Sequence, residues 1–425
     1  MSWHPHLWHP TTQVAVAPEP LRVVGSRGSL LELEDGRQLI DAISSWWVTL
    51  HGHAEPSIAA AIGRQAQQLE QVIFANFSHP PAEQLATRLS ALTGLERLFF
   101  SDNGSTAVEV ALKIAWQWWQ NQGHSHRKQL IAFEGAYHGD TFGAMAVGER
   151  SLFTDPFEPL LFDVARVAWP HTHWHDSGLD AREQAALGQL EAALQTPTAA
   201  VILEPLIQGA SGMRIVRPAF LRAVAAMVQS AGALLIADEV FTGFGRTGAL
   251  FACQKAGIQP DLMALSKGLT GGFLPMGVTL ASERLYQGFI GELPSATFFH
   301  GHSFTANPLG CAAALASLDL LQQTPERFQA FQQRHTPLLE ELAEHARVRQ
   351  PRCLGTLAAF ELDAGPDGYL NPVGKLIQRQ CLERGVYLRP LGNVVYLLPP
   401  LSISDAQLQR CYGAIRAAID AVLPG

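Results

Sequence analysis

The feature that most constrains the fold is a regular alternation of short apolar runs with longer helical patterns through the middle of the chain. Strands that alternate with helices in this way form a mainly parallel sheet whose two faces are covered by the helices. Proline in the first turn marks the start of several of these helices. The sequence therefore predicts an α/β fold, with strands at residues 97–101, 129–133, 199–203, 233–237 and 262–265, and helices at 56–72, 80–92, 106–121 and 218–231.

A second kind of pattern begins after about residue 323, where longer helical stretches surround a few extended pieces, as in an α+β domain. Near the N-terminus, short strands at 29–33 and 38–41 are joined by Asp35-Gly36 as a hairpin. We expect this hairpin to join the C-terminal part, because chain ends often pack together. The expected units are a large domain at 44–322 and a smaller domain formed by 1–43 and 323–425, the latter with helices at 326–347 and 404–422.

Composition excludes several classes of protein. The net charge is −8 and no basic patch stands out, so a nucleic-acid partner is not expected. None of the five cysteines forms a CxxC pair, which favours a reducing compartment. The first ten residues lack the apolar segment of a signal peptide, and no apolar run reaches 18 residues, so we expect a cytoplasmic protein without a membrane partner. Only 16% of the 425 residues are charged, which favours an oligomer.

Two charged residues at the ends of apolar runs indicate a chemistry. Asp238 ends the run 234–237, and Lys267 follows the run 262–265, which places both at the ligand-binding edge of a parallel sheet. Alone, the aspartate reads equally well as a helix cap or surface acid, and the lysine as a solvated strand end. Together they match pyridoxal phosphate, which needs an amine for its aldehyde and an acid for its pyridine nitrogen.

Two further segments suit the same cofactor. Gly104 and Ser105 lie in a turn that follows a strand and opens a helix, where free N–H groups and the helix dipole attract a phosphate. Tyr137 lies in a glycine-flanked loop, from which its ring could stack on a pyridine. A plain helix cap and a tyrosine packed on the core are the alternatives. The alternating His171, His173 and His175 lie in a Pro-, Asp- and Gly-rich loop and read as a surface loop or cleft wall, so no metal is expected.

The residues at 237–248 read ADEVFTGFGRTG and those at 265–268 read LSKG. With these motifs the chain resembles, over nearly its whole length, the class III aminotransferases, the ornithine-type group of fold-type I pyridoxal-phosphate enzymes. The resemblance implies a covalent bond between Lys267 and the cofactor, Asp238 at the ring nitrogen and Tyr137 on the ring. It also implies Glu204 near the cofactor.

The resemblance also implies a homodimer with shared active sites. Gly104 and Ser105 would hold the phosphate from one subunit, and Gly301, His302 and Ser303 would reach it from the other.

Within the family, four stretches resemble the branch that converts 8-amino-7-oxononanoate to 7,8-diaminononanoate in biotin biosynthesis. In that branch Arg389 would bind the substrate carboxylate, Trp46 would line its aliphatic tail, and Tyr137, Gly301 and Tyr396 would complete the substrate site. S-adenosylmethionine is the expected amino donor and lysine its rival. The four stretches are SSWW with HGH at 44–53, GAYHGDTFGAM at 135–145, IQGASGMR at 207–214, and GVYLRP with VYLLPP at 385–400.

Two positions depart from the pattern of this branch. A tyrosine is typical where Thr11 follows His9-Pro10, and Pro-Thr is found where this chain has His302-Ser303. A different class III aminotransferase, acting on an ω-amino acid or diamine with an α-keto acid acceptor, is therefore the first alternative. An aminomutase or decarboxylase with the same cofactor is the second. A cofactor-sensing DNA-binding protein is the third, but no basic DNA-binding segment precedes the fold.

Overall fold

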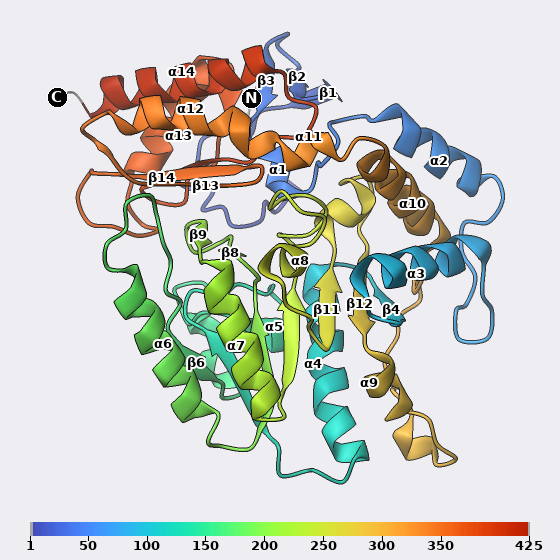
Figure 1. Cartoon of the computed structure of the whole chain (residues 1–425). Coiled ribbons are helices and arrows are strands. Elements are labelled where there is room, and N and C mark those ends of the chain that lie inside the picture. Colours follow the sequence, from blue (N-terminus) through green and yellow to red (C-terminus); the bar gives the residue numbers. More distant parts are fainter. Residues whose placement is uncertain (1–2, 424–425) are drawn as a thin grey trace.

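The fold is described from a computed structural model, which covers residues 3–423. Its largest element is a seven-stranded sheet in the order β4-β12-β11-β10-β7-β5-β6, seen at the centre of Figure 1. Every pairing from β11 to β6 is parallel, and β12 runs antiparallel to both of its neighbours. The strands are β4 (Arg97–Ser101), β5 (Gln129–Phe133), β6 (Ala165–Val167), β7 (Thr198–Leu203), β10 (Leu234–Asp238), β11 (Leu262–Leu265) and β12 (Gly277–Ala281).

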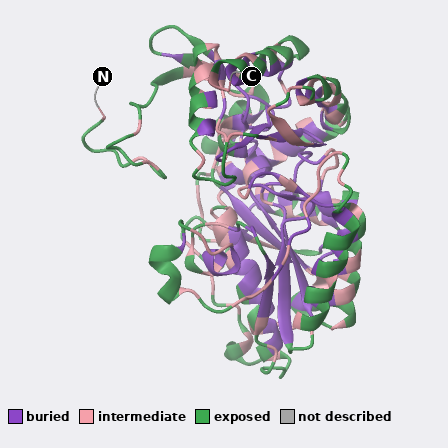
Figure 2. Cartoon of the chain, turned by 90° about the vertical axis from the view of Figure 1, so that its left-hand side faces the viewer, coloured by how far each residue is buried: buried purple, intermediate pink, exposed green. Residues whose placement is uncertain are grey.

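Successive side chains along the strands point to opposite faces of the sheet and pack into two hydrophobic layers. In β10, Leu234 and Ile236 pack in the layer that contains helix α4 (Gly104–Asn121). Leu235 and Ala237 point the other way, into the layer that contains α7 (Pro218–Ser230). The sheet is thus buried on both sides, as its apolar strands predict, and Figure 2 shows the buried residues concentrated along these strands. The remaining helices around the sheet are α2 (Pro56–Ala66), α3 (Pro80–Thr93), α5 (Phe142–Val147), α6 (Leu179–Ala193), α8 (Ala252–Ala256), α9 (Glu283–Gln287) and α10 (Pro308–Gln323).

The two ends of the chain meet in a second sheet of four strands, in the order β1-β2-β3-β15. The predicted N-terminal hairpin is confirmed, and its strand β3 pairs in parallel with β15 from the C-terminal part. Figure 1 shows these segments together at the top of the molecule. We therefore propose the division into 44–322 and a smaller unit of 1–43 with 323–425. The elements of the smaller unit are β1 (Val23–Arg27), β2 (Leu30–Leu33), β3 (Gln38–Asp41), α11 (Glu326–Gln329), α12 (Phe331–Ala343), β13 (Val348–Leu354), β14 (Leu357–Leu362), α13 (Val373–Glu383), β15 (Val386–Tyr387), β16 (Val394–Leu397) and α14 (Asp405–Val422).

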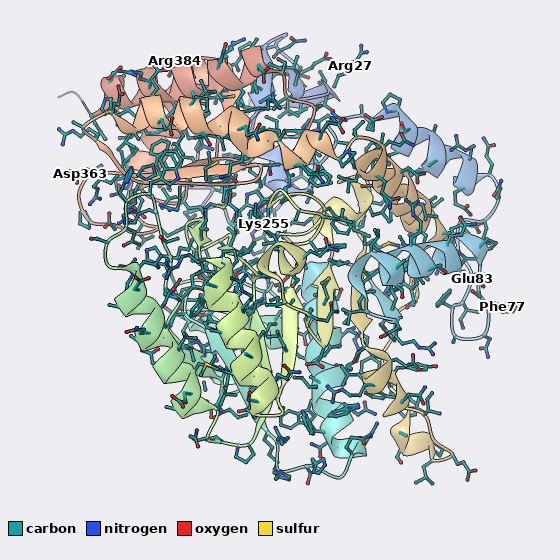
Figure 3. The ribbon with its side chains drawn as sticks, viewed as in Figure 1. Arg27, Phe77, Glu83, Lys255, Asp363 and Arg384 are labelled. Carbon is teal, nitrogen blue, oxygen red and sulfur yellow. The ribbon has the colours of Figure 1, made fainter. Side chains whose placement is uncertain are left out.

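Two helix predictions were too long. The helix expected at 56–72 ends at Ala66, where the Gln65 amide donates to the Leu69 carbonyl and holds the chain in a turn. The helix expected at 326–347 is two helices, α11 and α12, separated at Ala330. The antiparallel strand β12 was not predicted. Side chains such as Arg27, Phe77 and Glu83 project from the periphery in Figure 3. No helix within residues 3–423 is both long and apolar enough to cross a bilayer.

Candidate active site

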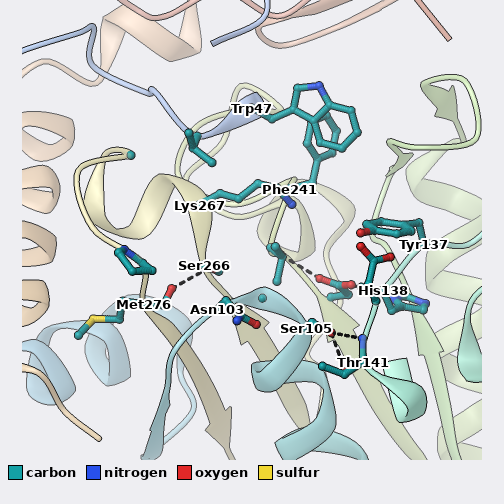
Figure 4. A pocket seen from close by; sticks show the side chains of 18 of the residues that line it. Trp47, Asn103, Ser105, Tyr137, His138, Thr141, Phe241, Ser266, Lys267 and Met276 are labelled. Carbon is teal, nitrogen blue, oxygen red and sulfur yellow. Dashed lines mark hydrogen bonds and ion pairs between the residues drawn. The ribbon is translucent and has the colours of Figure 1, made fainter. Parts of the chain in front are cut away.

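A pocket of about 630 Å³ opens beyond the carboxyl ends of β10 and β11 (Figure 4). Ligands bind at this edge in open α/β sheets. Asp238 pairs in register with Ala264, so Lys267 lies three residues beyond the strand neighbour of the aspartate. Six of the residues predicted from the sequence line this one pocket: Gly104, Ser105, Tyr137, Glu204, Asp238 and Lys267.

Lys267 is enclosed by the pocket and held in an unusual backbone conformation. Its φ of 43° lies in the left-handed region, where a residue with a side chain is strained. Its Nζ lies 5.6 Å from the centroid of the Trp47 ring. Burial lowers the pKa of Lys267 below its usual value, and the Asp238 and Glu204 carboxylates oppose this change. A lowered pKa raises the share of free amine, the form that attacks an aldehyde.

Asp238 is only 4% exposed and forms a pair with His138. The distance between its Oδ2 and Nδ1 of His138 is 2.6 Å. Because a carboxylate can only accept, His138 donates from Nδ1. Oδ1 of Asp238 accepts the N–H of Val240 at 3.0 Å. Nε2 of His138 is buried without a hydrogen-bond partner among the described residues. The aspartate is therefore fixed by two donors at the pocket wall.

The start of helix α4 provides an anion cradle. Asn103 caps the helix by accepting the N–H of Thr106 at 2.9 Å. The N–H groups of Gly104 and Ser105, which precede Thr106, have no acceptor within the helix. A Cβ on Gly104 would lie 2.6 Å from Cγ1 of Val240, so only glycine leaves this approach open. An amine enclosed by the pocket, a buried acid and this anion cradle lie on one pocket and fit pyridoxal phosphate.

A chain of hydroxyl groups orients Ser105 within the cradle. Thr141 donates its hydroxyl to Oε1 of Glu109 at 2.6 Å. The hydroxyl groups of Ser105 and Thr141 are 2.7 Å apart, so Ser105 must be the donor of that pair. Ser105 also accepts the N–H of Thr141 at 3.0 Å. The loop that carries Tyr137 is thereby tied to the first turn of α4.

Tyr137 presents its ring to the pocket (Figure 4). Enclosure by the pocket and the Asp140 carboxylate raise the pKa of its phenol well above the usual value. Its backbone N–H donates to Oε1 of Glu204 at 3.0 Å, and Oε2 accepts the N–H of Gly209 at 3.1 Å. Burial raises the pKa of Glu204 to about 7. Glu204 therefore lines the pocket and also joins the loop of Tyr137 to the loop of Gly209.

The two adjacent tryptophans lie in different places. Trp47 is buried, lines the pocket and donates from Nε1 to the hydroxyl of Tyr396 at 3.0 Å. Trp46 is 44% exposed and is not among the residues that line the pocket. Its ring instead lies 4.6 Å from the Arg389 guanidinium, which donates to the Thr11 hydroxyl at 3.1 Å. Arg389, Trp46 and Thr11 therefore form one cluster.

Gly301, His302 and Ser303 are not among the residues that line the pocket of the same chain. Nδ1 of His302 lies 3.2 Å from Oδ2 of Asp102, just before α4. The Ser303 carbonyl accepts from the Gln71 amide at 2.8 Å. The segment thus lies beside the start of α4, outside the pocket wall.

Sequence reasoning missed His138. His138 stands next to Tyr137 in a motif that was noted for its tyrosine and glycines alone. Its position, directly after a residue assigned to the cofactor, was the available signal. Trp46 was expected to line the aliphatic tail of the substrate, but Trp47 is the tryptophan that lines the pocket, because the strained turn sends the two adjacent rings in different directions. Glu239, the second acid of its motif, accepts the N–H groups of Ala252 and Cys253 and so anchors α8.

The profile of the class III aminotransferases matches residues 11–419. The chain is 57% identical to an adenosylmethionine-8-amino-7-oxononanoate aminotransferase from Synechococcus elongatus, over 99% of this chain and 100% of the relative. A protein of the same name from Geobacter sulfurreducens is 39% identical over 99% and 97% of the two chains.

Solved structures of aminotransferases share this fold over nearly the whole chain. Another protein of that name, from Methanocaldococcus jannaschii, superposes with a TM-score of 0.91 at 33% identity, covering 98% of this chain and 97% of the other. An amine transaminase from an uncultivated Pseudomonas species, with pyridoxal phosphate bound, has a TM-score of 0.92 at 29% identity, over 99% and 100% of the chains.

Proposed function

Since this chain belongs to the class III aminotransferases, which use pyridoxal phosphate, we propose that it aminates 8-amino-7-oxononanoate to 7,8-diaminononanoate in biotin biosynthesis. The proposed amino donor is S-adenosylmethionine. Full-length similarity to relatives named for this keto acid and this donor supports both assignments. We place the reaction in the cytoplasm, with small molecules as the partners and neither nucleic acid nor membrane involved.

We propose that Lys267 bonds to the cofactor aldehyde and that Asp238 holds a proton on the ring nitrogen. The cofactor supplies an electron sink for the carbon that carries the amino group. The Lys267 amine, once released, would carry the proton to and from that substrate carbon. Tyr137 would cover the ring, and the N–H groups of Gly104 and Ser105 would bind the phosphate.

The observation that carries the substrate assignment is the Arg389 cluster. The guanidinium rests on Trp46 and donates to Thr11, and no carboxylate within residues 3–423 forms an ion pair with it. A guanidinium has five N–H donors in a planar fork that suits a carboxylate. Arg389 can therefore bind the acid end of the nonanoate, while Trp47, which donates to the buried Tyr396, contributes an apolar wall.

We also propose a homodimer in which His302 and Ser303 reach the phosphate bound at Gly104 and Ser105 of the other chain. Their place outside the pocket of their own chain supports this. So do the neighbouring Phe299 and Phe304, whose exposed fractions are 74% and 60%. Apolar side chains exposed together mark interaction surfaces.

The test is an assay of the purified enzyme with 8-amino-7-oxononanoate and S-adenosylmethionine, with lysine replacing the donor in a second arm. We expect 7,8-diaminononanoate in the first arm. Arg389→Ala should raise the KM for the keto acid about 10- to 100-fold, because a lost charged hydrogen bond costs about 1.5–3 kcal/mol. Arg379→Ala, at an exposed arginine on α13, is the matched control. Activity on ornithine or 4-aminobutyrate with 2-oxoglutarate, and none on the keto acid, would leave only the family assignment standing.

A further inference from the structure

The turn that carries the two tryptophans is strained. It lies in the short element α1 (Ser44–Trp47), whose backbone departs from helical geometry. Ser44, Ser45 and Trp47 have φ angles of 53°, 59° and 67°, all in the left-handed region. Each such residue costs about 1–3 kcal/mol and persists only where its surroundings hold it. Neighbouring residues must therefore hold this turn in place.

The buried carboxylate of Asp41 accepts most of the hydrogen bonds that hold the turn in this conformation. Asp41 is fully buried, and its Oδ1 accepts the N–H of Ile43 at 3.2 Å. Its Oδ2 accepts the N–H and the hydroxyl of Ser45 at 2.6 and 3.1 Å. The same oxygen is 2.8 Å from Nε2 of His53, which must be the donor. Four donors thus converge on one carboxylate: two come from Ser45 in the turn, one from Ile43 just before it, and one from His53.

The turn decides where the two adjacent rings go. Trp47 enters the pocket, 5.6 Å from Nζ of Lys267, and donates to Tyr396. Trp46 faces away and supports Arg389. If the turn relaxed to an ordinary backbone, both rings would leave these positions together. The wall near the reacting amine and the platform under the arginine depend on the same few hydrogen bonds.

We propose that Asp41 and His53 are positioning residues for substrate recognition, which act by holding the strained turn and thereby both Trp46 and Trp47. Neither residue lines the pocket. Their effect on substrate passes through the two tryptophans. The inference rests on the proposed function for the identity of the substrate, and on the hydrogen bonds alone for the placement of the rings.

The first test is kinetic. Asp41→Asn keeps the shape but leaves one acceptor oxygen, so that the amide NH2 faces at least one of the four donors. We expect the KM for the keto acid to rise on the order of tenfold, with kcat little changed. Asp35→Asn, in the exposed turn of the N-terminal hairpin, is the matched control. If Asp41→Asn does not fold, Ser45→Ala and His53→Ala replace it, and His53→Gln, which retains a donor, should partly restore the KM.

A double-mutant cycle tests whether the effect passes through the rings. With Trp46 and Trp47 both changed to Ala, Asp41→Asn should add no further increase in KM, because the groups it positions are gone. An additive increase would contradict the proposal, as would an unchanged KM in the single variant. Melting temperature and cofactor content, measured in each variant, separate positioning from general loss of folding.

The placement of the rings is tested without any substrate, by ¹⁹F NMR of the fluorotryptophan-labelled holoenzyme. The resonances of Trp46 and Trp47 are assigned with the single Trp→Phe variants. Asp41→Asn should shift both, and Asp35→Asn neither. Unshifted resonances would overturn the inference even if the enzyme uses the expected keto acid. If it uses another class III substrate, the kinetic test is made with that substrate, and only the proposed function fails.

Discussion

Asp238 and His138 illustrate how single residues acquire a role from their surroundings. The carboxylate is almost fully buried, yet it keeps a face on the pocket and is fixed by donors from His138 and Val240. In this environment it can hold a proton on a pyridine nitrogen without moving. Its charge is the property that matters, because a neutral group would leave the ring unprotonated.

We therefore expect Asp238→Asn to bind the cofactor but to slow turnover by about 10²–10⁴-fold, which is the usual contribution of a positioned acid or base to the rate. Single-turnover kinetics and the cofactor content of the same sample would measure both. Asp319→Asn, at a surface carboxylate on α10, provides the comparison. A variant with ordinary turnover would show that Asp238 does not face the ring nitrogen.

At this scale the sequence revealed two residues that match one cofactor as a pair, although each alone has an ordinary structural reading. Asp238 and Lys267 stood out because a charge ended each apolar run, and both line the pocket. Trp46 and Trp47 could not be told apart, because their directions depend on a strained turn held by Asp41. Hydrogen bonds between residues that are distant in the sequence cannot be predicted from the local sequence pattern.

Among the elements, helix α4 contributes most directly to the site. Its first turn is capped by Asn103, joined to the Tyr137 loop through Ser105 and Thr141, and packed against Val240 at Gly104. The turn-and-helix pattern predicted this element correctly. Strand β12 was not predicted, because its antiparallel pairing with β4 and β11 is set by tertiary structure.

Gly104→Ala should weaken cofactor binding, because the new Cβ would lie 2.6 Å from Cγ1 of Val240 and displace the turn that presents the N–H groups. Titration of the apoenzyme with pyridoxal phosphate would measure the change, for which we expect at least a tenfold rise in Kd, or about 1.4 kcal/mol. The control is Gly63→Ala in α2, where nothing lies within 4 Å and alanine should stabilise the helix by up to about 1 kcal/mol. Equal affinity in the two variants would argue against a phosphate site at α4.

On the scale of the whole molecule, the two chain ends form one sheet through the pairing of β3 with β15. The sequence indicated this association only through the general tendency of chain ends to pack together. The pairing matters for the site, because Asp41 ends β3 and Arg389 follows β15 by two residues. The turn that holds the tryptophans and the arginine proposed to bind the acid are thus brought together by strands from opposite ends of the chain.

The proposed dimer makes a prediction at the same scale. Ser303→Ala should lower the affinity for the cofactor while the enzyme remains dimeric, because one hydroxyl donor to the phosphate is lost, at a cost of about 0.5–1.5 kcal/mol. Sedimentation of the wild-type holoenzyme should show a dimer. A fully active monomer would contradict a site shared between two chains.

The most direct test of the active site is to find which lysine holds the cofactor. Borohydride reduction of the holoenzyme makes the bond between lysine and cofactor permanent, and digestion with mass spectrometry then locates the modified peptide. We expect the modification on Lys267, and we expect Lys267→Ala to lose both the modification and nearly all turnover. A cofactor recovered on another lysine, such as Lys255 or Lys113, or an active Lys267→Ala enzyme, would contradict the site described at the ends of β10 and β11.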